Sequence, residues 1–142
     1  MNVWPPFRGA GVRVRHIAAD WHETRVELNL GLFNRNYVGT HFGGSLYAMT
    51  DPFHMLMLIH LLGPEYVVNH KGGRIDYLAP ARGRVTATLR IEDTVVEAIR
   101  ARVASAGKDA PEFSADILDA AGVVVARAIH TLHVRRKGAA PA

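Results

Sequence analysis

The sequence predicts an α+β domain in which an antiparallel six-stranded sheet wraps around one long central helix. Three observations predict this class. The longest apolar segment has the length of a helix, strand-like segments precede and follow it, and these strands come in groups rather than alternating with helices. Because 142 residues with 49% hydrophobic composition can bury one sizeable core, we expect a single domain over residues 1–142.

The N-terminal part is predicted to hold an arm and two strands. Residues 1–11 combine Trp4 and Phe7 with several prolines and glycines, a composition typical of an irregular arm or short turn packed on the domain. Strands are predicted over residues 12–19 and 24–32, where apolar and polar residues alternate.

The central segment, from Asn36 to Gly63, reads NYVGTHFGGSLYAMTDPFHMLMLIHLLG and supplies the long helix, from about Gly44 to Leu62. The polar residues inside it favour a buried helix over a membrane span. Because this helix is apolar on nearly every face and one curved sheet covers only part of it, a partner subunit is expected to cover the rest. Pro52 removes a helical N–H group, which predicts a kink or break at the peptide after Asp51.

Two strands are predicted directly after the central helix. Residues 65–79 have apolar residues at both ends and Gly72-Gly73 in the middle, which indicates a strand with a bulge or bend. Residues 84–92 alternate regularly between apolar and polar side chains. The second of these strands is therefore expected to have one wet face.

A second helix and a hairpin complete the predicted fold. The helix spans about residues 95–106, between strands four and five, and is expected to begin at the capping box Thr94-Val95-Val96-Glu97. Residues 112–119 and 123–134 are predicted to be strands joined by a tight turn. The last residues, Lys137 to Ala142, are predicted to be a flexible tail.

The cysteine content and the charge exclude or disfavour several kinds of function. Zero cysteines remove disulfides, thiol nucleophiles and cysteine-ligated metal sites, and suit a reducing compartment. The net charge of +4 is small and the basic residues are scattered, so no nucleic-acid partner is expected. Since the N-terminus lacks a basic stretch followed by an apolar one, we expect a cytoplasmic protein without a membrane partner.

The stretch GTHFGGSLYAMTDP resembles the start of the central helix in the hotdog superfamily, in which a sheet wraps a helix and two subunits pair. Gly43-Gly44 opens the helix and Asp51 lies seven residues after Gly44, which is similar to the spacing in acyl-CoA thioesterases of the phenylacetate-pathway type. In those enzymes a histidine directly precedes the glycine pair, whereas Phe42 separates His41 from Gly43 here.

The resemblance extends from WPPFRGAG near the N-terminus to Tyr77-Leu78-Ala79-Pro80, where the pattern is similar to one hotdog branch of thioesterases. It implies the hotdog fold, hydrolysis of an acyl thioester and self-association as a homodimer. Whether dimers pair into a homotetramer stays open.

Thioester hydrolysis needs a polarised carbonyl and an activated water or an attacking carboxylate. The backbone N–H groups of Gly43 and Gly44 are expected to polarise the carbonyl, because donors at a helix start stabilise a developing oxyanion. Asp51, the one carboxylate in the apolar segment, is expected to be buried and to act as general base or nucleophile. The structural alternatives are a tight helix start for the glycines and a hydrogen-bonded buried carboxylate for Asp51.

The spacing of these two groups predicts a site shared between subunits. Seven residues of helix rise about 10 Å, so Gly44 and Asp51 of one chain can hardly contact one thioester together. Two central helices packed antiparallel about a twofold axis would bring Asp51 of one chain toward the glycine pair of the other.

The remaining candidate residues are assigned to substrate binding or orientation. Asp51 and His54 are three residues apart and can pair, whereas His60 lies on another face, so no metal site is expected. His41 is expected to face the substrate, and Ser45 to cap the helix or support the site. Asn36 and Thr40 are expected to hold the loop or position a water, and Phe53 and Met55 to pack in the core or line an acyl tunnel. The candidates for the phosphates of coenzyme A, with ordinary solvated charges as the alternative, are Lys71, Arg74, Arg82 and Arg84.

The leading hypothesis is therefore an acyl-CoA thioesterase that uses no cofactor besides the coenzyme A of its substrate. The alternative is a protein of the same fold that binds an acyl or other apolar ligand without turning it over. A dehydratase is less favoured, because no aspartate–histidine hydratase signature is found. The acyl chain, the carrier (coenzyme A or an acyl-carrier protein), the pathway and the choice between direct attack and water activation stay open.

Overall fold

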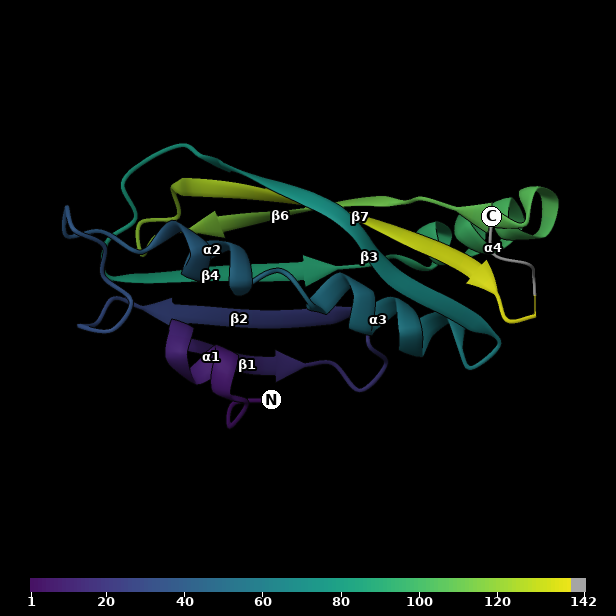
Figure 1. Cartoon of the computed structure of the whole chain (residues 1–142), viewed down its shortest axis with the longest axis horizontal. Helices are drawn as coiled ribbons and strands as arrows, with labels where there is room; N and C mark the ends of the chain where they lie inside the picture. Colours follow the sequence, from purple (N-terminus) through teal and green to yellow (C-terminus); the bar gives the residue numbers. More distant parts are fainter. Residues whose placement is uncertain (139–142) are drawn as a thin grey trace.

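The structure, a computed structural model, describes residues 1–138 and shows one antiparallel sheet curved around a pair of helices (Figure 1). Within the described residues the sheet has seven strands in the order β1-β2-β4-β6-β7-β3, with the short β5 paired to β7. The strands are β1 (Val12–Ile17), β2 (Glu23–Asn29), β3 (Tyr66–Tyr77), β4 (Arg84–Arg90), β5 (Lys108–Asp109), β6 (Glu112–Leu118) and β7 (Val124–Arg136).

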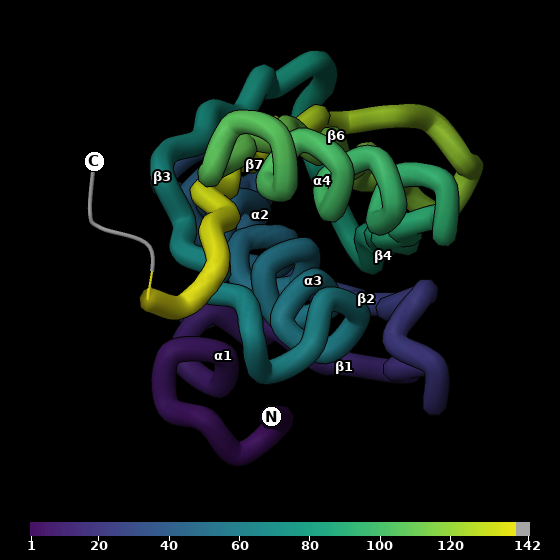
Figure 2. Tube along the Cα trace, turned by 90° about the vertical axis from the view of Figure 1, so that its right-hand side faces the viewer, coloured from purple at the N-terminus to yellow at the C-terminus, as the bar shows by residue number. Residues whose placement is uncertain are grey.

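The helices differ in their relation to the sheet. They are α1 (Pro5–Ala10), α2 (Gly43–Ala48), α3 (Phe53–Leu62) and α4 (Asp93–Ala106). The end view shows α3 in the hollow of the sheet, with α1 on one side and α4 on the other (Figure 2). The pair α2 and α3 thus takes the place of the single long helix predicted from the sequence.

The predicted α+β class and the order of the elements are confirmed. Each of the six predicted strands is present, with ends that differ from the prediction by at most three residues. The additional strand β5 has two residues, too few to show a hydrophobic period. Of the tail predicted over residues 137–142, residues 139–142 lie outside the described part of the chain.

The N-terminal arm contains a helix of six residues, where an irregular arm or short turn was predicted. Pro5 and Pro6 occupy the first positions of α1, where a missing N–H group costs no intrahelical bond. Gly11 ends the helix in the left-handed region, with φ of 81°. Phe7 is buried and packs on Phe53 of α3, with ring centroids 5.7 Å apart. The prolines and the glycine therefore start and stop a short helix.

The start predicted for α4 was wrong. The helix begins at Asp93, one residue before Thr94, and Glu92 is its N-cap residue. No side chain caps it, so the reciprocal bonds of a capping box are not formed.

β3 carries the predicted bulge. It pairs with β7 along its whole length, and the register shifts between His70 and Gly72. A Cβ atom on Gly73 would collide with the hydroxyl of Tyr47 and would lie 2.9 Å from the carbonyl oxygen of Ile129. The absence of a side chain at this position lets Tyr47 of α2 lie directly against the backbone of β3.

The core lies between the helices and the concave face of the sheet. Val85, Ala87 and Leu89 of β4 are buried, and the residues between them are exposed. This confirms the prediction of one wet face on β4. Met57 and Leu58 of α3 are completely buried.

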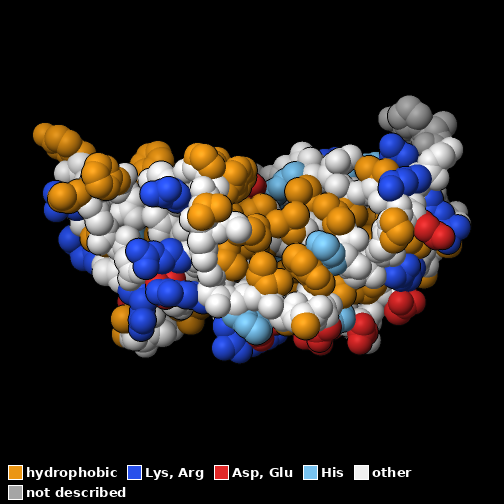
Figure 3. All heavy atoms as spheres, turned by 90° about the horizontal axis from the view of Figure 1, so that it is seen from below, with side chains coloured by type: hydrophobic (Ala, Val, Ile, Leu, Met, Phe, Trp, Pro, Cys, Tyr) orange, Lys and Arg blue, Asp and Glu red, His pale blue; other side chains and the backbone are white. Residues whose placement is uncertain are grey.

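Part of the apolar surface remains uncovered in the single chain. Seen from below, hydrophobic side chains gather across the middle of one face, with histidines among them (Figure 3). Trp4 and Ile59 keep 49% and 41% of their surface exposed. The partner subunit expected to cover apolar helix surface stays a prediction. No helix within residues 1–138 is long and apolar enough to cross a membrane.

Candidate active site

The central helix is broken where Pro52 predicts it. α2 ends at Ala48 and α3 begins at Phe53. In the turn between them, the backbone N–H groups of Thr50 and Asp51 both donate to the carbonyl of Tyr47, at 3.0 and 3.1 Å. Because Pro52 has no N–H group to continue the helix, the break is built into the sequence.

The break turns Asp51 toward β3. Its carboxylate is 45% exposed, with one oxygen (Oδ1) 3.4 Å from Nδ1 of His70. Asp51 is therefore not the buried acid that the surrounding apolar residues indicated. Burial raises the pKa of the Tyr47 hydroxyl, and the negative charge of Asp51 raises it further.

A second imidazole reaches the same place from β7. His130 is completely buried, and its ring centroid lies 5.3 Å from that of His70. Its Nε2 lies 3.0 Å from the hydroxyl oxygen of Thr50. Burial lowers the pKa of His130 to about 4, the charge of His70 lowers it as well, and Asp51 opposes the shift. Asp51, His70 and His130 each place a possible ligand atom within 4.8 Å of the other two.

His54 does not take the place beside Asp51. Its ring is buried and stacks on Phe113 of β6, with centroids 4.8 Å apart and planes 18° from parallel. Among the described residues, its Nδ1 finds no hydrogen-bond partner. Burial lowers the pKa of His54 to about 3, and the charge of His130 contributes to the shift.

The depressed pKa of His54 predicts a loss of stability in acid. The unfolded chain binds a proton at this histidine below about pH 6.5, whereas the folded chain does so only near pH 3. The free energy of unfolding should therefore fall by about 1.4 kcal/mol per pH unit between these values on account of His54 alone. Urea denaturation from about pH 7 to about pH 4 should show a shallower dependence for His54→Asn than for the wild type.

His16, which is exposed on β1, provides the matched control. The same substitution there should leave the slope unchanged. Equal slopes for His54→Asn and the wild type would contradict the assigned burial.

At the other end of α2, the two glycines approach aromatic rings. A Cβ atom on Gly43 would lie 2.6 Å from the hydroxyl oxygen of Tyr77, and one on Gly44 would collide with the ring of Phe42. Within residues 1–138, no hydrogen bond engages the backbone N–H groups of these two glycines. They are the unsatisfied donors expected at a helix start.

A pocket of about 580 Å³ opens beside this helix start. It brings together five of the residues predicted for the site, from the loop before α2 and the turn after β3. Leu46, Leu78 and Ala79 give it an apolar wall. The predicted residues that line it are Asn36, Thr40, His41, Gly43 and Arg82.

The loop residues of this pocket are largely bound to one another. The amide of Asn36 donates to the hydroxyl of Thr40 at 2.7 Å and accepts from its backbone N–H at 2.9 Å. Nε2 of His41, which is buried, donates to the carbonyl of Gly83 at 2.8 Å. Burial lowers the pKa of His41, and this hydrogen bond partly offsets the shift. Burial thus favours the neutral form of His41, and its remaining nitrogen has no partner in the described residues.

Of the predicted cations, Arg82 alone lines this pocket, and it donates to the carbonyl of Gly39 at 3.4 Å. The other predicted residues lie apart from the pocket. Lys71 lies with Lys108 near β5, and Arg84 lies beside Asn29 of β2. Arg74 is exposed on β3, Ser45 is buried, Phe53 belongs to the core, and Met55 packs against the core.

The helix start and the helix break are two separate places in one chain. Tyr77 lies beside the helix start and His70 lies beside the helix break, and both residues belong to β3. Seven residues of strand span about 23 Å. This separation along β3 is larger than the rise of about 10 Å expected between Gly44 and Asp51 along the helix, and either distance is too long for both groups to contact one thioester.

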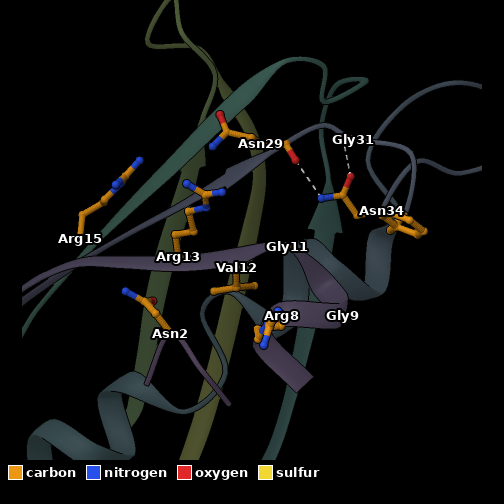
Figure 4. A pocket seen from close by; sticks show the side chains of 11 residues that line it. Asn2, Arg8, Gly9, Gly11, Val12, Arg13, Arg15, Asn29, Gly31 and Asn34 are labelled. Atoms are coloured by element: carbon orange, nitrogen blue, oxygen red, sulfur yellow. Dashed lines mark hydrogen bonds between the residues drawn. The ribbon is translucent and has the colours of Figure 1, made fainter. Parts of the chain in front are cut away.

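A second pocket, of about 510 Å³, lies between α1, β1 and the loop after β2 (Figure 4). Arg8, Arg13 and Arg15 give it a basic lining. Asn34 shapes the loop by donating to the carbonyl of Asn29 at 2.8 Å and accepting from the N–H of Gly31 at 2.7 Å. None of the residues predicted for the site lines this pocket.

Sequence reasoning missed His70, His130 and Tyr77. His70 and Tyr77 come from β3, directly after α3, and His130 comes from the distant β7. Only the pairing of β3 with β7 brings the two histidines together. The glycine pair after His70 was the one local signal, because a bulge re-aims the side chains around it.

Comparison with known proteins gives one family and a common fold. The model of a domain of unknown function, DUF4442, matches residues 1–134. No curated protein matches the sequence significantly.

Solved structures share the fold at low identity. A protein of unknown function from Pseudomonas aeruginosa, described as a probable thioesterase, has a TM-score of 0.77 and 18% identity, with 91% of this chain and 85% of that chain covered. A thioesterase from Haemophilus influenzae has a TM-score of 0.70 and 14% identity, with 95% and 85% covered. A mutant of a Staphylococcus aureus thioesterase has a TM-score of 0.68 and 14% identity, with 92% and 98% covered. These likenesses confirm the hotdog fold.

Proposed function

The chain belongs to the family of the domain of unknown function DUF4442, and on that premise we propose that it hydrolyses an acyl thioester such as an acyl-CoA, at a site shared between two subunits. The observation that carries the proposal is the position of Asp51. Its carboxylate is held half-exposed at a built-in break of the central helix, in a fold shared with proteins described as thioesterases.

In this proposal Asp51 acts on the thioester through one of two routes. As a general base, its carboxylate takes a proton from water while the water oxygen attacks the carbonyl carbon. The C–S bond then breaks, and the thiolate leaves and takes up the proton. As a nucleophile, the carboxylate attacks the carbonyl carbon, and the C–S bond breaks with release of the thiolate, which takes up a proton from water. Water hydrolyses the resulting anhydride in a second step, which restores the Asp51 carboxylate and frees the acid.

The carbonyl oxygen would bind at the helix start of the other subunit. The free N–H groups of Gly43 and Gly44 are donors for the negative charge that develops on this oxygen. The pocket beside them has room for the acyl or pantetheine part of a substrate, and Arg82 at its edge is suited to a phosphate of coenzyme A.

The distance between Asp51 and the glycine pair requires a second subunit. Asp51 and the glycine pair of one chain are too far apart to act on one carbonyl group. A homodimer with antiparallel central helices would pair each Asp51 with the partner's glycine pair. It would also cover exposed apolar surface such as that at Ile59.

Binding of an apolar ligand without turnover is the second candidate. The lining of the pocket favours it. Asn36 and Thr40 form hydrogen bonds with each other within the loop, and the pocket wall beside them is apolar. Such a pocket offers few polar groups to a reacting carbonyl.

A panel of short, medium, long-chain and aromatic acyl-CoAs separates the two candidates. We expect release of free thiol from at least one class, measured with a thiol reagent. Saturable binding of an acyl-CoA with no turnover of any thioester would favour the binding protein instead.

A further inference from the structure

We propose that Asp51, His70 and His130 form a binding site for one divalent transition-metal ion, best matched to Zn²⁺. Two imidazoles and one carboxylate converge here from three separate elements: the turn between α2 and α3, β3, and β7. Zn²⁺ takes nitrogen and carboxylate ligands of this kind, and three protein ligands with an open fourth position are typical of its reactive sites. The proposal concerns binding alone and does not rest on thioester hydrolysis.

A hydrogen bond decides which ring nitrogen of His70 can bind an ion. Its Nε2 lies 3.1 Å from the carbonyl oxygen of Gly72. A carbonyl only accepts hydrogen bonds, so Nε2 must carry the hydrogen. In the neutral ring, Nδ1 is then the atom with a free lone pair, and Nδ1 is the atom that faces Asp51.

With the ring of His70 neutral, two electron-pair donors face each other. Nδ1 of His70 and Oδ1 of Asp51 are 3.4 Å apart, an arrangement that a cation between or beside them stabilises. Two ligand atoms bound to one tetrahedral zinc ion at about 2.1 Å lie about 3.4 Å from each other. For the His70–Asp51 pair, the spacing thus matches that of two ligands on one zinc ion.

His130 supplies the third ligand. Its ring is completely buried, and Nδ1 has no hydrogen-bond partner in residues 1–138. The Thr50 hydroxyl donates its hydrogen to the carbonyl of Tyr47 at 2.9 Å, so its oxygen accepts from Nε2 of His130 at 3.0 Å. In this neutral tautomer, Nδ1 of His130 is the atom with a free lone pair for an ion. A hydrogen bond to the second nitrogen is the usual support of a metal-bound histidine.

The cluster is accessible to an ion and to a further ligand. The side chains of Asp51 and His70 are 45% and 24% exposed, whereas His130 lies at the bottom of the site. Water can take the fourth position from the exposed side. The sequence predicted no metal because it compared only histidines of the central helix, and the strands supply the ligands instead.

Calorimetric titration of the chelator-treated protein with Zn²⁺ tests the proposal. We expect one ion per chain, and affinity at least 100-fold lower for His70→Asn, His130→Asn and Asp51→Asn. Thr50→Val, which removes only the support of His130, should lower affinity about 10-fold. His133→Asn, on the same strand as His130, should leave it unchanged.

Absorption of the Co²⁺-loaded protein gives a second readout, because a tetrahedral site yields intense visible bands. We expect these bands in the wild type and in His133→Asn, and their loss in His70→Asn. His70 is part-exposed, so this variant tests the site even if His130→Asn fails to fold. Lack of saturable Zn²⁺ binding by the wild type would overturn the proposal, and so would equal affinity in the wild type and in a folded His70→Asn variant.

Discussion

Replacing Asp51 by asparagine is expected to lower kcat/KM for the best acyl thioester by about 10²- to 10⁴-fold. Asparagine keeps the size and polarity of the side chain, but it can neither take a proton from water nor attack the carbonyl as a carboxylate. The half-exposed position of the side chain means that the fold should tolerate the change. The measurement is steady-state hydrolysis in buffer containing a chelator, so that no bound ion contributes.

Asp76→Asn is the matched control, because Asp76 is an exposed aspartate on β3. This variant should retain wild-type kcat/KM. Hydrolysis that survives Asp51→Asn undiminished would remove Asp51 from the reaction, whichever route the attack takes.

Replacing Gly43 by valine is expected to lower kcat by about 10²- to 10³-fold, the usual effect of losing one oxyanion donor. A side chain at this position would meet the hydroxyl of Tyr77 and crowd the space in front of the free N–H groups. The loss should appear in kcat more than in KM if the donors act chiefly on the transition state.

Gly9→Val controls for the cost of valine at a glycine of a short helix. A Cβ atom on Gly9 of α1 meets nothing within 4 Å, so this variant should keep its activity. An equal loss of activity in the two variants would point to impaired folding rather than to a blocked helix start.

The fold could be predicted because its signals are local. The regular alternation of Val85, Ala87 and Leu89 gave β4 and its wet face, and Pro52 gave the position of the helix break. The helix α1 was missed because Pro5 and Gly11 were interpreted as loop residues, although each occupies the helix position that suits it.

The candidate site could be predicted only in part, for the same reason. The residues of the loop before α2 are neighbours in sequence, and the pocket does unite Asn36, Thr40 and His41. The partner of Asp51 could not be found in this way. His70 reaches it from β3, directly before a bulge, whereas helical spacing pointed to His54.

The most direct test of the shared site uses two inactive variants in one molecule. Asp51→Asn and Gly43→Val chains with different affinity tags are co-expressed, and the mixed dimer is purified through both tags. It contains one site with both groups intact and one with neither, so it should recover about half of the wild-type activity per dimer. A mixed dimer as inactive as its two parents, or a protein that is active as a stable monomer, would contradict the account.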